Sequence, residues 1–592
     1  MLQVIAKVYD TGMLNRRQKI LLPAVMILLL IAAWLWWNRP RRVNLAEYAP
    51  AESLVFLETN DLPELLSGIT STTAWRELAR AAGIDKPLGN LGWLGRLAAW
   101  TSIGPNELVI YGRAQVAVCV MGFEAAEEAG TAALNIKPKA ALILETHSSE
   151  RRARAFVDRF VDAFARRSFG AVQEASREES GVYFRTWGAP DGKRKIFAAL
   201  TGSLIIVGND EGAVRSCLLV SQNGQPALSG DPKLEEMRGR VSNPDTLSFG
   251  YVAPAGSQKI LEVAVIAYAG QVSADPKMQS ALAILLPQMA ERFLGSAGWG
   301  ARIVEGAIED RYFLTVAGGL SERLQQSLAT LPRPSNGAAQ FLPQNTSQVT
   351  NYNYASPDQA WRGINSAISS QLDITLAPLV IRFLDESLRP FGIDSPREFL
   401  KAVGPELTTA RLDSGGESLV FIAPVRDAGL ARAQLLPRFG SRPQIIKIGS
   451  SEMFVAKDEE DSAASFLSNY LIMGAAADVR RCLEAYAAKT LVQNESFEWA
   501  VHSAFYAEAS GVATLTDESE SVEALLRPLA RRGDRMQPRK SVTSLEAGWR
   551  KLPYSVSQTR LGEAGVERIK HSAFGLYGTI IKQFIRDANI EK

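Results

Sequence analysis

An uninterrupted apolar segment near the amino terminus constrains this chain more than any other feature. Residues 20–37, ILLPAVMILLLIAAWLWW, carry no ionisable side chain. As a helix they would span about 27 Å, close to the hydrocarbon core of a bilayer. Pro23 falls in the first turn, where a missing N–H costs little, and Trp34, Trp36 and Trp37 gather at the far end, where indole rings favour the interface. The segment is predicted to be a transmembrane anchor.

The residues on either side of this segment bear on its processing and orientation. A cleaved signal peptide needs a small-residue cleavage site, whereas NRPRRVNLAEY follows here, so an uncleaved anchor is expected. Four Lys or Arg residues precede the segment and three follow it closely, and this small excess favours a cytoplasmic tail at 1–19. No later apolar run is long enough to span. The rest of the chain is expected outside the cytoplasm.

Composition indicates globular packing and argues against several classes of protein. Hydrophobic residues make up 46% of the 592 residues and charged residues 22%, so most of the chain can bury apolar surface. A net charge of +2 argues against a nucleic-acid-binding surface. Three cysteines cannot build a disulfide framework, and three histidines argue against a multi-histidine metal centre.

Similar segments recur in the same order along the chain, which indicates an internal duplication. The matching pairs are 103–108 with 403–408, 204–218 with 471–483, and 301–316 with 559–574. The offset between partners falls gradually from 300 to 258 residues, as expected for copies that differ in loop length. TLPRPSNGAAQ at 330–340 has the composition of a linker. Two tandem units are therefore predicted, residues 45–330 and 343–592.

Periodicity within a unit predicts an α+β fold of antiparallel sheets with packed helices. An apolar run at 141–147 has the character of a strand, and a helix is expected to follow it. The strand-like runs from 182 to 208 predict an antiparallel meander closed by a helix that carries Val214 and Leu218. The intervening helix is expected to place five apolar residues on one face, namely Phe156, Val157, Phe160, Val161 and Phe164.

Sequence motifs of established catalytic chemistry are absent, including the nucleophile elbow, the phosphate-binding loop and the HExxH zinc motif. His147 precedes Ser148, but adjacent residues rarely face each other as base and nucleophile, so a structural role is expected. His502 and His571 have no Cys or His at ligand spacing. We predict no catalytic, cofactor-binding or metal-ligating residue, and no cofactor.

Three other features have simple structural interpretations. Cys119, Cys217 and Cys482 lie in apolar patterns and are expected to be buried free thiols. The acidic run at 458–461 lacks the spacing and glycine of a calcium loop, so a solvated turn is expected. The basic stretch at 527–540 is expected to be an exposed surface; contact with anionic lipid or another acidic polymer is the alternative.

Three segments carry a family resemblance: PAESLVFLETNDLPELLSGI at 50–69, NYASPDQAWRGI at 353–364 and FGLYGT at 574–579. They resemble a family of bacterial membrane-anchored proteins known as a domain of unknown function, in which a Pro-Ala-x-Ser/Thr-x-hydrophobic strand opens a large extracytoplasmic region. The resemblance covers most of residues 45–592. It implies a single-pass protein of the bacterial cytoplasmic membrane with its bulk periplasmic or extracellular, and it supplies no active-site residue.

The leading functional hypothesis is a non-enzymatic binding or scaffolding protein of the cell envelope, with the membrane and an envelope protein or lipid as partners and no nucleic acid. A pair of tandem units can form a cleft at its interface. The first alternative is a protein that binds a hydrophobic ligand or lipid, with the apolar stretches at 260–294 and 371–387 as pocket walls.

The second alternative is a carboxylate-dependent hydrolase. Glu305 and Glu309 recur in the second unit as Glu563 and Glu567. Carboxylates four residues apart on a strand lie on one face, where solvated hairpin charges are expected in place of an acid–base pair.

Overall fold

The computed structural model describes residues 41–579 with internal gaps, together with Met26, Leu29 and Leu30, which are helical and exposed. The gaps are 82–84, 128–133, 273–286, 288–290, 332–336, 344–345, 371–376, 379–380, 382–384, 386–392, 394, 414–417, 436–438, 440–442, 457–461, 489–509 and 519–553. The acidic run at 458–461, the basic stretch at 527–540 and His502 lie outside the described residues. Almost all of the predicted anchor at 20–37 does so too. No helix among the described residues is long and apolar enough to cross a membrane.

Antiparallel strands dominate the described chain, as the α+β prediction requires, and twenty of them form one continuous sheet. The strands of the first half (residues 41–331) are β1 (Val55–Thr59), β2 (Gln115–Glu127), β3 (Leu134–Glu145), β4 (Gln173–Glu179), β5 (Val182–Gly188), β6 (Lys195–Thr201), β7 (Leu204–Gly208), β8 (Ser248–Val252), β9 (Leu294–Val304) and β10 (Ala307–Val316). Those of the second half (residues 337–579) are β11 (Gln348–Tyr352), β12 (Leu407–Arg411), β13 (Val420–Pro424), β14 (Gln444–Ile448), β15 (Ser451–Val455), β16 (Ser462–Leu467), β17 (Tyr470–Ala475), β18 (Val512–Thr516), β19 (Ser555–Gly562) and β20 (Gly565–Ser572).

The two halves of the sheet have the same order of strands when each half is followed from its outer edge to the centre. Pairing gives β4-β5-β6-β7-β3-β2-β1-β8-β9-β10-β20-β19-β18-β11-β12-β13-β17-β16-β15-β14. Each half therefore runs from its fourth strand at the edge to its tenth strand at the centre. The halves meet where β10 pairs with β20, an antiparallel ladder from Ile308 opposite Ser572 to Thr315 opposite Gly565.

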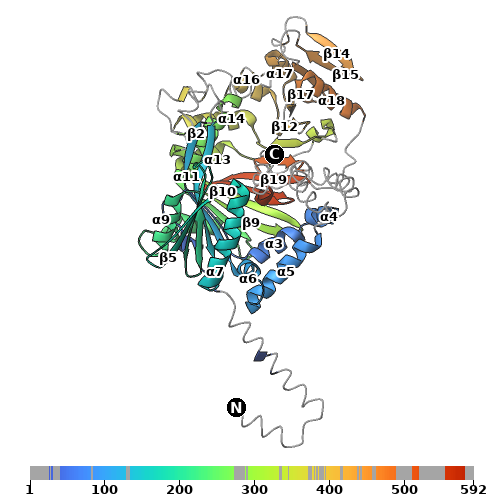
Figure 1. Ribbon diagram of the computed structural model, residues 1–592. Coiled ribbons are helices and arrows are strands. Elements are labelled where there is room, and N and C mark those ends of the chain that lie inside the picture. The colour runs from blue at the N-terminus through green and yellow to red at the C-terminus, as the bar shows by residue number, and fades with distance from the viewer. Residues whose placement is uncertain are drawn as a thin grey trace, which may run out of the picture.

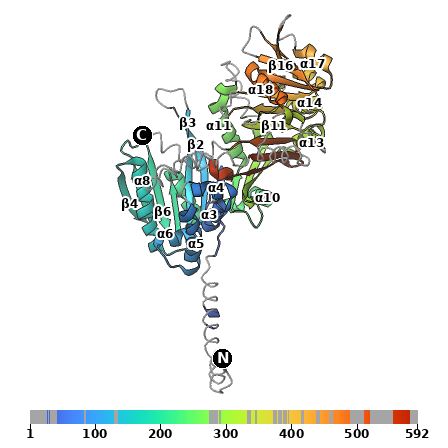
Figure 2. The same ribbon diagram turned by 90° about the vertical axis from the view of Figure 1, so that its right-hand side faces the viewer.

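Helices lie between the strands along the chain and cover the sheet (Figures 1 and 2). In the first half they are η1 (Leu45–Glu47), α3 (Leu62–Ser71), α4 (Thr73–Ala81), α5 (Asp85–Thr101), α6 (Asn106–Arg113), α7 (Glu150–Phe156), the π-helical η2 (Val157–Val161), α8 (Asp162–Phe169), α9 (Glu211–Ser221), η3 (Leu228–Gly230), α10 (Pro232–Val241), α11 (Pro254–Val272) and α13 (Gly318–Ser327). In the second half they are η4 (Gly337–Phe341), α14 (Pro357–Ser369), α16 (Pro396–Ala402), α17 (Ala428–Leu435) and α18 (Ala476–Ala487).

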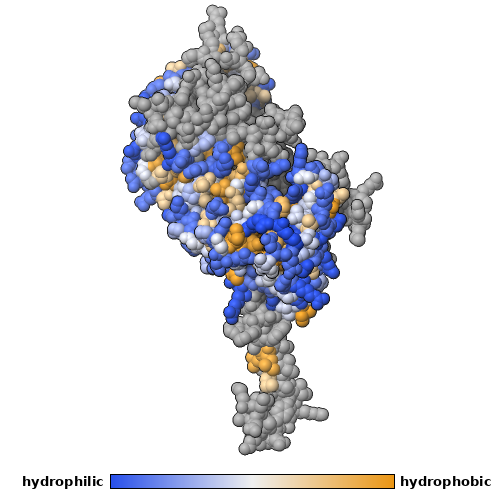
Figure 3. Space-filling view, turned by 60° about the vertical axis from the view of Figure 1, so that its left-hand side comes forward, coloured by the Kyte–Doolittle hydropathy of each residue, from blue (hydrophilic) through white to orange (hydrophobic). Residues whose placement is uncertain are grey.

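Each half buries an apolar core on both faces of its part of the sheet. Ile205 and Ile206 are neighbours on β7, yet Ile205 packs with α7 and α8 whereas Ile206 packs with α9 and α10. This division follows from the strand, because successive side chains point to opposite faces. In the second half, Val349 packs with η4 and α18, and Phe421 packs with α16 and α17 on the other face. On the side of the molecule shown in Figure 3, the described surface is mainly hydrophilic with a few hydrophobic patches.

The predicted meander and its closing helix are confirmed as β5, β6, β7 and α9, with Val214 and Leu218 buried. The predicted helix after β3 is also present, but its apolar face differs. Val157 and Val161 are buried, whereas Phe160 is 59% and Phe164 54% exposed. The π-helical turn η2 has more residues per turn than an α-helix, so residues four apart lie on the same side of the helix. Val157 and Val161 therefore both face the sheet.

Candidate ligand-binding site

In the structure, the side chains of His147 and Ser148 form hydrogen bonds with different partners. His147 Nε2 lies 2.8 Å from Gln115 Oε1, while Ser148 Oγ lies 2.9 Å from Thr146 Oγ1. Burial lowers the pKa of His147; the charge of Glu145 opposes that shift and Arg113 adds to it. His147 therefore belongs to a buried polar network that supports the end of β3.

The four glutamates of the hydrolase hypothesis do not share one exposed face, and that expectation is wrong. Glu305 lies in the turn between β9 and β10 with a φ of +51°, so strand periodicity does not apply to it. Glu309 is buried, 2.6 Å from Arg302 Nε and 3.4 Å from His571 Nε2. Glu563 and Glu567 follow the same division: Glu563 is exposed in the β19–β20 turn, and Glu567 lies 3.5 Å from Arg311.

The cysteines are buried free thiols, as predicted. The structure adds a contact that sequence reasoning missed: Cys119 Sγ on β2 lies 3.3 Å from Cys217 Sγ on α9. Periodicity assigns each thiol to the core, but it cannot show which thiols of that core meet.

A concave site lies in the second half of the described chain, between the sheet and its helices. It has a volume of about 570 Å³, within the range of small-molecule sites. Its walls come from β11, β12, β13, β18, α14, α16 and neighbouring residues. The lining residues are Gln348, Thr350, Tyr352, Tyr354, Pro357, Ala360, Trp361, Ile364, Ile393, Phe399, Leu400, Leu407, Thr409, Ala410, Arg411, Leu419, Phe421 and Val512.

Strand alternation builds the floor of this pocket. Every second residue of β11 lines it, and the register sets a residue of β12 opposite each one. The cross-strand pairs are Gln348 with Arg411, Thr350 with Thr409, and Tyr352 with Leu407. The alternate residues of β11, such as Val349, point to the opposite face and pack with η4 and α18. This part of the sheet thus packs against η4 and α18 on one face and lines the pocket on the other.

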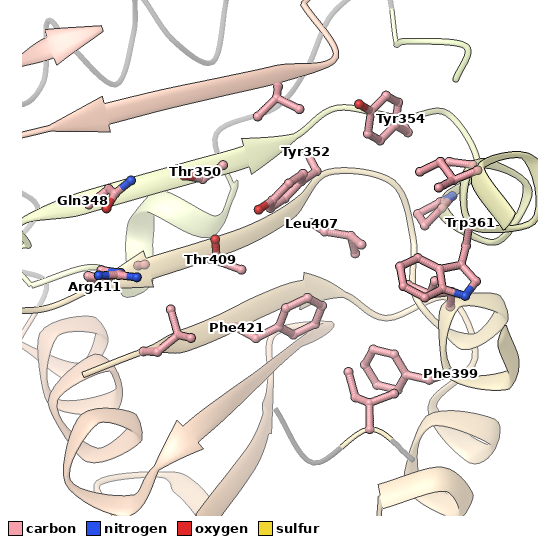
Figure 4. A pocket seen from close by; sticks show the side chains of 18 residues that line it. Gln348, Thr350, Tyr352, Tyr354, Trp361, Phe399, Leu407, Thr409, Arg411 and Phe421 are labelled. Carbon is pink, nitrogen blue, oxygen red and sulfur yellow. The ribbon is translucent and has the colours of Figure 1, made fainter. Parts of the chain in front are cut away.

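The pocket changes from polar to apolar along its length (Figure 4). Gln348 and Arg411 lie together at one end, and the threonine pair of β11 and β12 follows. Trp361 and Phe399 lie at the other end. Most of the lining between and around these groups is aliphatic or aromatic. Such a gradient suits a ligand with an anionic or polar head and an apolar body.

Contacts among the aromatic residues hold the apolar end in shape. Phe399 and Phe421 have ring centroids 5.8 Å apart at an interplanar angle of 56°. Trp361 Nε1 donates to Asp385 Oδ1 at 3.3 Å, which orients the indole. Burial raises the pKa of Tyr354, and the neighbouring Tyr352 adds to the rise, so Tyr354 is a neutral phenol at physiological pH. These side chains offer apolar area and hydroxyl groups.

Among the described residues that line the pocket there is no His, Cys, Asp or Glu. Over the described residues, no group of three or more His, Cys, Asp or Glu side chains could hold a metal ion. The described lining offers a concave surface of aromatic, aliphatic and polar side chains that can bind and orient a molecule.

Of the two walls expected for the hydrophobic-ligand alternative, the stretch at 260–294 does not line this pocket. Helix α11, which covers part of 260–294, belongs to the first half, and most of 371–387 lies outside the described residues. The signal that could have located the site is the alternation of mixed-polarity residues in QVTNY and LTTAR at 348–352 and 407–411. Comparison with family models, characterised proteins and solved structures gives no match.

Proposed function

We propose that this protein is a membrane-anchored, extracytoplasmic binding protein of two tandem units, which holds an amphipathic lipid-like molecule in the pocket of its second unit. The observation that carries the ligand class is the gradient in that pocket from Arg411 and Gln348 to Trp361 and Phe399. The anchor is residues 20–37, and a bacterial envelope location rests on that segment and on the family resemblance.

The strand order supports the tandem duplication. When the strands of each half are numbered from one to ten, both halves have the order 4-5-6-7-3-2-1-8-9-10. Unrelated segments would rarely share so long an order. The hairpins β9–β10 and β19–β20 align at a constant offset of 258 residues, and at that offset Arg311 pairs with its own counterpart, Ile569. One of the sequence matches is not structurally equivalent, since Gly104 precedes α6 whereas Gly404 follows α16.

The polar end of the pocket suits a carboxylate or phosphate. A guanidinium offers charge-assisted hydrogen bonds, which are stronger than neutral ones. Gln348 and Thr409 add an amide and a hydroxyl on the same face of the sheet. A fatty acid or a phospholipid fragment would place its head there and its chain against Trp361 and Phe399. Each buried methylene contributes about 0.8 kcal/mol.

Photo-crosslinking in a membrane tests this function. The full-length protein is reconstituted in lipid vesicles with a fatty acid that carries a photoreactive diazirine on its chain, and labelled peptides are identified by mass spectrometry. We expect label on β12, β13 and α14. Label on residues 20–37 reports contact with the bilayer independently. Label confined to that segment would overturn the pocket assignment.

Two substitutions sharpen the experiment. Thr409→Trp fills the middle of the pocket and should abolish label on α14, while the midpoint of thermal unfolding verifies folding. Arg411→Ala removes the cationic head contact, worth about 1.5–3 kcal/mol, so the fatty acid should label at least about tenfold more weakly. Arg480→Ala is the matched control, because Arg480 is exposed on α18 on the other side of the sheet.

Topology needs its own test. Protease added to intact spheroplasts should digest the two units and leave the segment at 1–37 protected. Survival of the large fragment would place the units in the cytoplasm and would contradict the proposed location.

A further inference from the structure

Helix α5 presents its large apolar side chains outward and its small ones inward. Gly92, Gly95 and Ala98 are buried against the protein. On the opposite side, Trp93 is 65%, Leu97 41% and Trp100 47% exposed, and Ile103, just after the helix, is 72% exposed. Trp93, Leu97 and Trp100 have spacings of four and three residues, so they form one stripe. We call these three residues and Ile103 the apolar ridge.

The inward face explains how the helix is held without its large residues. A Cβ on Gly112 of α6 would lie 2.2 Å from the Gly95 carbonyl oxygen, so the two helices are in backbone contact. A Cβ on Gly95 would lie 2.6 Å from the Tyr111 ring. Glycine thus fixes α5 against α6, and the side chains of the apolar ridge are exposed on the other face of the helix. A contiguous exposed apolar surface of this kind marks an interaction site.

Helix α5, which carries the apolar ridge, lies next to the point where the chain joins the first unit. Arg42 Nη2 is 3.6 Å from both Asp61 Oδ2 and Glu64 Oε2, at the start of α3. Between those two acids, Pro63 packs against α5: its Cγ lies 3.2 Å from the site of a Cβ on Gly95. Both ribbon views place α5 and α6 at the lower end of the body (Figures 1 and 2), and one of the hydrophobic patches in Figure 3 lies at its lower tip.

The link to the predicted anchor is short. The Gln115 side chain forms two hydrogen bonds with the backbone of Val43. Its Nε2 donates to the Val43 carbonyl oxygen at 2.9 Å, and the Val43 N–H donates to its Oε1 at 2.8 Å. The six links from Trp37 to Val43 reach at most about 22 Å when fully extended. A bilayer that holds residues 20–37 would therefore lie within that distance of Val43.

We infer that the apolar ridge rests on the outer surface of the bilayer that holds the anchor. This inference depends on the proposed anchoring by residues 20–37. Trp side chains favour the lipid interface, and an amphipathic helix that lies in its plane buries such a stripe among the headgroups. Arg96 is exposed on the same side of α5 and suits a phospholipid phosphate. The body is thus fixed by a second contact beside its tether.

Depth-dependent quenching in vesicles tests the bilayer contact. The three native cysteines are buried, so Leu97→Cys offers an exposed thiol for a fluorescent label on the full-length protein. Lipids carrying a nitroxide near the headgroup should quench most of that fluorescence. Ile445→Cys is the control, because Ile445 is 51% exposed on β14, at the edge of the second half.

The outcomes separate the inference from the anchoring on which it rests. Vesicle flotation shows whether the protein is anchored at all. Protein that floats with the vesicles but shows equal, weak quenching at both positions would overturn the apolar ridge alone. Protein that does not float would overturn the anchor and the ridge together.

A separate observation concerns the thiol pair. Cys119 and Cys217 are fully buried with Sγ atoms 3.3 Å apart. Cys119 on β2 lies opposite Ala141 on β3. In the second half, Ala410 on β12 lies opposite Val420 on β13, so alanine occupies the position that is equivalent to Cys119. Cys482 on α18 is thus a single thiol in an equivalent setting.

We propose that Cys119 and Cys217 become a disulfide when the chain folds in an oxidising compartment. The pair gives up two protons and two electrons to a disulfide-bonded oxidant, which is reduced to two thiols as the Sγ–Sγ bond forms. The sulfurs must approach by little more than 1 Å to reach bonding distance. Since both are buried in the folded core, we expect exchange to occur before the core closes.

Alkylation of the full-length protein, unfolded without reductant, counts the free thiols. We expect label on Cys482 alone, and on Cys119 as well in the Cys217→Ser variant. Label on all three after isolation from membranes and also after refolding with oxidised glutathione would overturn the disulfide. Label on all three only in the membrane-derived sample would overturn the extracytoplasmic location instead, because the pair would then be competent but kept reduced.

Discussion

At the scale of single residues, Asp310 is the most unusual group that sequence reasoning did not single out. It is fully buried on β10, where Trp299 Nε1 donates to Oδ1 at 2.9 Å and the Leu576 N–H donates to Oδ2 at 3.0 Å. Burial raises the pKa of Asp310 to about 6, although both donors and the charge of Lys570 oppose the rise. The carboxylate therefore joins the two halves at a cost in desolvation.

The sign of the resulting pH dependence follows from the raised pKa. The folded state holds the Asp310 proton more tightly than the unfolded state, so this residue stabilises the fold below about pH 4 and loses that contribution as the pH rises to 6. The difference between a pKa of about 6 and the ordinary value of 3.8 corresponds to about 3 kcal/mol. Relative to wild type, Asp310→Asn should thus become more stable by about that amount between pH 4 and pH 7.

Denaturant unfolding at a series of pH values measures this difference. Asp358→Asn is the control with the opposite sign. Burial alone would raise the pKa of Asp358, but hydrogen bonds from Ser356 and Arg362 lower it. Wild type should therefore lose stability relative to Asp358→Asn as the pH falls below 4. A constant difference between wild type and Asp310→Asn across the range would contradict the prediction.

At the scale of secondary-structure elements, the contact between α5 and α6 depends on glycine. Gly112→Ala should destabilise the protein by about 1–3 kcal/mol, because the new Cβ cannot lie 2.2 Å from the Gly95 carbonyl oxygen without separating the helices. The matched control is Gly239→Ala on α10, where a Cβ meets nothing within 4 Å. There the better helix propensity of alanine should stabilise by up to about 1 kcal/mol. Equal effects at both sites, measured by thermal unfolding, would refute the close contact.

Elements were predictable from sequence where one periodicity decided the outcome. The meander of β5, β6 and β7 and helix α9 alternate or repeat clearly enough to be located. The face of the helix at 150–169 was not predictable, because the π-turn at η2 changes which residues align. The pocket was missed for a different reason. The alternation within β11 and within β12 is visible in the sequence, but the pairing of these two strands with each other is a long-range contact. The meeting of Cys119 with Cys217 is another contact of that kind.

At the scale of the whole molecule, the two halves are interlocked as well as joined edge to edge. Beyond the β10–β20 ladder, the end of the described chain enters the first half. Tyr577 packs with Trp299, Ala301 and Ile308 in one cluster, at a ring-centroid distance of 5.7 Å from Trp299. Phe574 lies edge-on to Trp75 at 6.5 Å. Residues of the second half therefore complete a core that belongs to the first.

This interlock predicts that a substitution in the second half will loosen strands of the first. Tyr577→Ala removes a buried ring and should cost about 3–5 kcal/mol. Hydrogen exchange, followed by mass spectrometry, should show the loss of protection in β8, β9 and β10. Tyr554→Ala is the matched control, because Tyr554 is equally buried but packs in the core of β11 and β19. Tyr554→Ala should lower the hydrogen-exchange protection of the second half first. Identical exchange patterns in the two variants would mean that the halves unfold as one unit and would contradict a separate effect of the interlock.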